Sequence, residues 1–166
     1  MKTIIFIACA LLAPGASAGE ARVNWVNPEK FTDIRSGEES PADALNTVKT
    51  EFKQIFARLS KHLPQGYVME VSVEDVDLAG EVRYRLSHST KNYRIVKDID
   101  WPKLKFSYSI RDEQQREVAS GKEELRDLDF AAKINTSNSQ FKFEEQMLKD
   151  WFKREHLVQK VGMIQK

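Results

Sequence analysis

The sequence predicts an α+β fold, in which a mostly antiparallel sheet of four to five strands carries two helices on one face. Apolar residues recur at helical spacing in two long segments, 41–63 and 140–158. Apolar and polar residues alternate at 22–26, 67–73 and 103–111, and a turn at 112–115 leads into a partner strand at 116–125. The expected order is strand, helix, strand, long loop, strand, strand, helix. The direction of the first strand relative to the second stays open.

The first 18 residues have the features of a secretory signal peptide. Lys2 supplies a positive start, residues 4–12 are apolar, and Ala16, Ser17 and Ala18 form a small-residue cleavage signal. We therefore expect cleavage after Ala18, export to the periplasm, and a single domain at 19–166. The apolar run is shorter than the roughly 20 residues that cross a bilayer, so no transmembrane segment is expected.

Cys9 is the only cysteine and follows a loosely lipobox-like Phe6-Ile7-Ala8. Apolar residues continue past it, and cleavage there would leave too short a signal, so we favour cleavage at Ala18 over a lipid anchor. The mature chain then contains no thiol and holds no disulfide in an oxidising compartment.

Composition and motifs narrow the classes of function. The chain has 26 Lys and Arg against 25 Asp and Glu, and removal of Lys2 leaves a net charge of zero with neutral histidines. Export and neutrality disfavour nucleic acid as a partner. No serine-hydrolase, zinc-protease, dinucleotide or P-loop motif occurs, and the three histidines lack metal-site spacing. We predict no cofactor and no catalytic residue, and we lean toward a protein that is not an enzyme.

The two predicted helices carry different signals. Ser40 is expected to cap the first one, with Pro41 at its first position, Asp43 in its first turn, and Pro64-Gln65-Gly66 at its end. The last helix, 140–158, should be capped by one of the polar residues 135–139. Its wide apolar face suits packing on a sheet and on another helix, or against a partner.

The segment 67–80 contains the first candidate site. Tyr67, Met69, Val71 and Val73 define an apolar face, which Asp75 and Asp77 continue at a spacing of roughly 6.5–7 Å. Such a pair could bind calcium or act as an acid and a base in glycan hydrolysis. The simpler interpretation, which we favour, is that the strand ends there and the carboxylates are solvated or paired. The candidate partners for such pairs are Arg83, Arg85, Arg94 and Lys97.

The second candidate surface is the basic loop that follows. Residues 81–105 include seven basic and three acidic side chains, interleaved with Tyr84, Tyr93 and Trp101. This composition suits an anionic glycan, an anionic lipid head group or the acidic patch of an envelope protein. An ordinary surface loop with ion pairs worth at most about 1 kcal/mol each is the alternative. The candidate binding residues are Asp75, Asp77, Arg83, Arg85, Arg94, Lys97 and Trp101.

Four segments resemble a family of bacterial envelope proteins, the domain-of-unknown-function family DUF3016: VNWVNPEKFTDI at 23–34, VEDVDLAGEVR at 73–83, YRIVKDIDWPKLKFSY at 93–108 and FEEQMLKDWF at 143–152. The resemblance implies a signal-bearing periplasmic protein of Gram-negative bacteria. It supplies no activity, cofactor or catalytic residue.

Three hypotheses for function follow. The first is a non-enzymatic binding or assembly module of the cell envelope that works through the acidic strand end and the basic loop. The alternative is a calcium-dependent or glycan-directed periplasmic hydrolase that uses Asp75 and Asp77. A scaffold whose surface matters only within a complex is the third.

Overall fold

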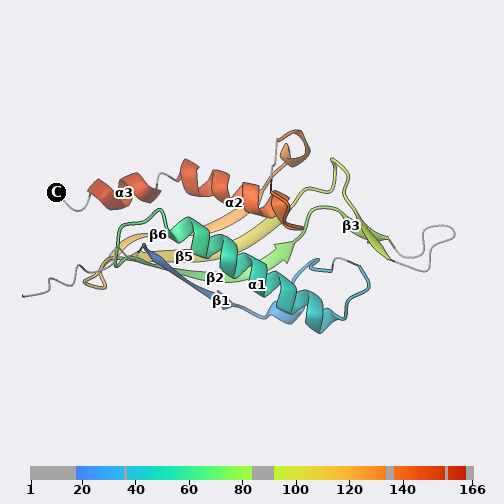
Figure 1. Cartoon of the computed structure of the whole chain (residues 1–166), viewed down its shortest axis with the longest axis horizontal. Helices are drawn as coiled ribbons and strands as arrows, with labels where there is room; N and C mark the ends of the chain where they lie inside the picture. Colours follow the sequence, from blue (N-terminus) through green and yellow to red (C-terminus); the bar gives the residue numbers. More distant parts are fainter. Residues whose placement is uncertain (1–17, 36, 84–91, 134–136, 156, 164–166) are drawn as a thin grey trace, which may run out of the picture.

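A sheet and two long helices form the two layers of the fold, which confirms the α+β class (Figure 1). The computed structural model describes residues 18–35, 37–83, 92–133, 137–155 and 157–163. The strands are β1 (Glu20–Trp25), β2 (Val68–Asp77), β3 (Glu81–Arg83), β4 (Tyr93–Ile95), β5 (Lys103–Arg111) and β6 (Glu117–Arg126). The α-helices are α1 (Pro41–Ser60), α2 (Lys142–Arg154) and α3 (Leu157–Met163), and short 3-10 turns lie at Pro28–Lys30 and Phe130–Ala132.

The main sheet has the order β1-β2-β5-β6 and is mixed, with one parallel pairing beside the two antiparallel ones that the sequence predicted. β1 runs parallel to β2, with Val23 opposite Val71, because α1 carries the chain back to the end of the sheet where β1 began. The other two pairings, β2 with β5 and β5 with β6, are antiparallel as expected. β3 and β4 form a separate two-stranded sheet.

Helix α1 begins as predicted, since the Oγ of Ser40 accepts a hydrogen bond from the N–H of Asp43 at 3.1 Å. Val48, Phe52 and Phe56 on its inner face are fully buried. The helix ends at Ser60, earlier than the predicted Pro64, and two tight backbone turns follow it.

Two helices, α2 and α3, take the place of the predicted last helix. At the end of α2, the N–H of Glu155 donates a hydrogen bond to the carbonyl of Trp151. The predicted polar cap is wrong in detail. The N-cap residue is Phe141, and Ser139 accepts a hydrogen bond from the Phe141 N–H at 3.1 Å. No helix in the described ranges has the length and apolar character needed to cross a membrane.

The core between the layers is aromatic. Trp151 of α2 is fully buried and meets Phe106 and Tyr108 of β5 edge-on, with ring centroids 4.9 and 5.2 Å apart. Burial raises the pKa of Tyr108 to about 12, and the nearby carboxylate of Glu155 acts in the same direction. Gly121 of β6 lies opposite Tyr108, and a Cβ there would come within 2.9 Å of the ring, so the backbone of β6 approaches the aromatic core closely at this position.

Candidate functional site

Asp75 and Asp77 lie on the open face of the sheet, not on the core face where the sequence placed them. A β-bulge shifts the register between Val73, which pairs with Phe106, and Asp75, which pairs with Lys105. The extra residue inverts the alternation, so Val76 takes the core position and is fully buried. The prediction that the acidic pair continues the apolar face is therefore wrong.

Each of these two carboxylates has partners within the fold. Asp75 accepts hydrogen bonds from the N–H and the hydroxyl of Thr32, at 2.8 and 2.7 Å, and so fixes the segment after β1 against β2. Asp77 lies 2.7 Å from the Nζ of Lys103 on β5. Within the described ranges, no group of three or more His, Cys, Asp or Glu residues could hold a metal ion. This arrangement matches the simpler interpretation of paired carboxylates, with different partners from those predicted.

The long loop after β2 contains the β3–β4 hairpin, which extends beyond the end of the main sheet (Figure 1). Gly80 makes the sharp turn into it with a φ of 83°, a conformation that disfavours a side chain. A Cβ at this position would also collide with the carbonyl of Ile95. The hairpin is thus a distinct element of the molecule, where the sequence indicated little more than one short strand.

Arg94 joins this hairpin to the rest of the domain. Its side chain is only 12 % exposed and pairs with the carboxylate of Asp33 at 2.8 Å. The guanidinium also donates hydrogen bonds to the carbonyl of Arg35 at 2.9 Å and to that of Gly80 at 2.7 Å. Further bonds reach the carbonyls of Leu78 and Ala79. Arg94, a predicted binding residue, therefore uses its donors within the fold.

The other predicted residues of the loop lie in different surroundings. Arg83 and Lys97 both pair with Glu81. The hydrogen bond from Lys97 lowers the pKa of Glu81, and the bond from Arg83 adds to this effect. Trp101 lines a small cavity of about 170 Å³ together with Asp77 and Lys103, and its buried indole N–H has no hydrogen-bond partner in the described part of the chain. Arg85 falls outside the described residues.

Sequence reasoning missed Glu144. This carboxyl group is 2 % exposed in the first turn of α2 and accepts a hydrogen bond from the N–H of Ala79 at 2.8 Å. Burial raises the pKa of Glu144, while the bond from Ala79 and the positive charge of Arg94 oppose that change. The signal was present: Glu144 lies three residues after Phe141 and four before Leu148, on the apolar stripe of its helix.

Glu144 also borders a pocket of about 560 Å³ at the base of the hairpin. Leu78, Ala79, Arg94 and Val96 form one side of this pocket, and the start of α2 forms the other. The pocket and the hairpin make one continuous candidate surface, built from the end of β2, from β4 and from the first turn of α2.

These features define a two-layer α+β domain with a projecting basic hairpin. Residues 19–154 match the model of a family described as "Protein of unknown function (DUF3016)". The chain belongs to this family, as the resemblance indicated. The curated proteins and the solved structures contain no match to the chain.

Proposed function

We propose that this protein is a non-enzymatic binding module of the bacterial cell envelope, and that its hairpin binds an acidic patch on another envelope protein. One observation carries the proposal. Of the six large apolar side chains that are exposed in the described ranges, three fall within one seven-residue stretch that begins on β4, at Tyr93, Val96 and Ile99. Their exposed fractions are 47, 42 and 66 %.

The charge of the hairpin region favours an acidic partner. Residues 81–105 carry four more basic than acidic side chains, from seven against three. Exposed aromatic and aliphatic side chains next to arginine are typical of protein interfaces, so a protein suits this surface better than a glycan does. Arg94 holds the hairpin in place before binding, which reduces the entropy lost on association.

Export to the periplasm is part of the proposal. The described fold supports it at the expected cleavage site: Ala18 is exposed, whereas Gly19 is buried and its carbonyl accepts a hydrogen bond from the hydroxyl of Ser60 at 3.1 Å. The family match also begins at residue 19. N-terminal sequencing of the protein from a periplasmic fraction tests this step, and an N-terminus other than Gly19 would contradict it.

Site-specific photo-crosslinking in native envelopes tests the interface. A photoreactive residue replaces Tyr93 or Ile99 in turn, and matched probes replace Val26 and Leu128, which are exposed apolar residues outside the hairpin. We expect the first two probes to capture one acidic protein, and Arg83→Glu combined with Lys97→Glu to abolish the capture. Equal products at all four positions, no product, or capture of glycan or lipid would refute the proposal.

The alternative from the sequence, a calcium-dependent or glycan-directed hydrolase, has less support because Asp75 and Asp77 already hold Thr32 and Lys103. A calcium titration followed by the melting temperature decides between the two. A calcium-dependent rise that Asp77→Asn removes would favour the alternative.

A further inference from the structure

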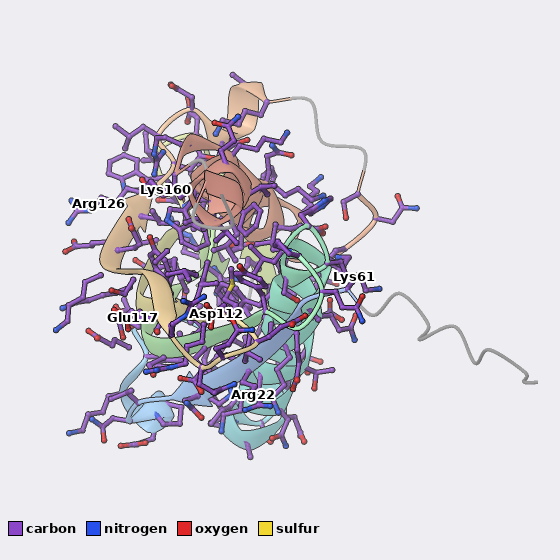
Figure 2. All side chains as sticks on the ribbon, turned by 90° about the vertical axis from the view of Figure 1, so that its left-hand side faces the viewer. Arg22, Lys61, Asp112, Glu117, Arg126 and Lys160 are labelled. Atoms are coloured by element: carbon purple, nitrogen blue, oxygen red, sulfur yellow. The ribbon has the colours of Figure 1, made fainter. Side chains whose placement is uncertain are left out.

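A groove with an apolar floor and a basic rim lies between the end of α1 and the α2–α3 pair. We call it the helical groove. Leu59, Phe152 and Val158 form its floor, Arg58, Lys149 and Lys153 form its rim, and its volume is about 650 Å³. The end-on view shows α1 and the α2–α3 pair as neighbours, with Lys61 just after α1 and Lys160 on α3 (Figure 2). In Figure 1, α3 lies at the end of the molecule opposite the hairpin.

We propose that the helical groove binds one molecule of a single-chain amphiphile with a carboxylate head group, a fatty acid. The proposal does not depend on the hairpin or on the function proposed for it. The volume lies in the range of pockets that hold one small molecule, which suits one acyl chain better than a two-chain phospholipid.

The floor suits an alkyl chain. Leu59 and Phe152 are 5 and 4 % exposed, and Val158 of α3 is 44 % exposed. An alkyl chain along this floor would remove the apolar surface of Val158 from water, which favours binding. His62 lies at the edge of the floor, with its ring centroid 6.3 Å from that of Phe152.

The rim supplies the charge that a carboxylate needs. Arg58 and Lys149 both approach the single carboxylate of Glu145, at 3.3 and 2.9 Å, so one of these two positive charges is not neutralised. Lys153 is exposed, and its charge also acts on Asp150, which is bound to Lys133 at 2.7 Å. The nearby Glu155 is paired with Lys160 at 3.2 Å. Three rim cations thus face the carboxylate of Glu145, and Asp150, which shares Lys133 with Asp127, offsets one more of them, which leaves one positive charge for an anionic head group.

Calorimetric titration of the purified chain with dodecanoate below its micellar concentration tests the proposal. We expect saturable binding of one molecule per chain, and much weaker binding of dodecan-1-ol, which has the same chain without the charge. Lys153→Glu should weaken dodecanoate binding at least tenfold, through the loss and reversal of a rim charge. Val158→Asp should do the same by placing a carboxylate on the apolar floor.

Two matched variants control for charge and for stability. Val26→Asp changes a valine of similar exposure, 42 %, outside the groove, and Lys122→Glu reverses an exposed charge on β6. Both should bind dodecanoate like the wild type. Equal affinity in all four variants, tight binding of dodecan-1-ol, or the absence of saturable binding would overturn the proposal. Binding to phosphatidylglycerol vesicles without binding to free dodecanoate would also overturn it, because it would indicate a membrane-docking face.

Discussion

Replacement of Arg94 by alanine should loosen the hairpin from the body and destabilise the whole fold. The side chain is 12 % exposed, and its partner Asp33 is 30 % exposed. The change removes an ion pair of 2.8 Å and the donors to four backbone carbonyls, those of Arg35, Leu78, Ala79 and Gly80. The hairpin thus loses its contacts with residues 33–35 and with residues 78–80, which follow β2, at the same time.

The magnitude follows from the burial of the pair. Loss of one partner from a fully buried pair costs about 3–5 kcal/mol, and loss of an exposed pair costs at most about 1 kcal/mol. Because Asp33 keeps some access to water, we expect a loss of roughly 2–3 kcal/mol. For a chain of this length that corresponds to a decrease in melting temperature of roughly 5–10 °C. Arg94→Lys should recover little, since an ammonium group cannot reproduce the planar fork of donors.

Thermal and urea unfolding, followed by circular dichroism, measure this loss. Arg83→Ala is the matched control, because it removes the same residue type from the same hairpin, where the side chain is 48 % exposed and pairs with the half-exposed Glu81. Its cost should stay below about 1 kcal/mol. Amide hydrogen exchange should show faster opening of β3 and β4 in Arg94→Ala alone. Equal stability of the two variants would refute the structural role given to Arg94.

Three further changes test other parts of the structure. Burial raises the pKa of Glu144, so ionisation of this carboxyl group destabilises the fold as the pH rises. The E144Q variant keeps an oxygen that can accept the hydrogen bond from Ala79, and it should be more stable than the wild type at pH 8. This difference in stability should vanish below 4.5, the ordinary pKa of a glutamate. A difference in urea midpoint that is the same at pH 8 and pH 4 would contradict this. Gly121→Ala should cost roughly 1–3 kcal/mol in urea unfolding, because its Cβ would crowd the ring of Tyr108, whereas Lys122→Ala next to it should be nearly neutral. Ser40→Ala should lower the free energy of unfolding by about 1 kcal/mol through the lost cap, and Ser40→Gly by only a few tenths; a larger loss for glycine would show that the cap is not the cause.

Local signals made helix α1 predictable from the sequence. Its cap at Ser40, its proline at the first position and its apolar spacing all lie within the segment itself, and the structure confirms each of them. The direction of β1 could not be derived in this way, because the pairing of residues 20–25 with 68–73 depends on where the whole crossover returns. Sequence order alone allows both directions.

The bulge at the end of β2 did leave a signal in the sequence. Apolar residues occupy the odd positions Val71 and Val73, and then the even positions Val76 and Leu78. This change of parity marks one extra residue in the strand, and it moves Asp75 and Asp77 to the open face. The sequence contains no comparable pattern that would predict the contacts of Arg94 with the rest of the domain. Arg83, Arg85 and Arg94 look equivalent in sequence, and only the meeting of three distant segments distinguishes Arg94.

Ala79 explains why those distant segments act together. Its N–H donates to the buried carboxyl group of Glu144 on α2, and its carbonyl accepts from Arg94 on the hairpin. The backbone of one residue thus connects the helix layer to the projecting element, next to the turn at Gly80. Because Arg94 also lowers the pKa of Glu144 through its charge, the two side chains depend on each other electrostatically as well as through this backbone. A partner that displaced the hairpin would remove Arg94 from Ala79 and would therefore change the surroundings of Glu144 in the first turn of α2.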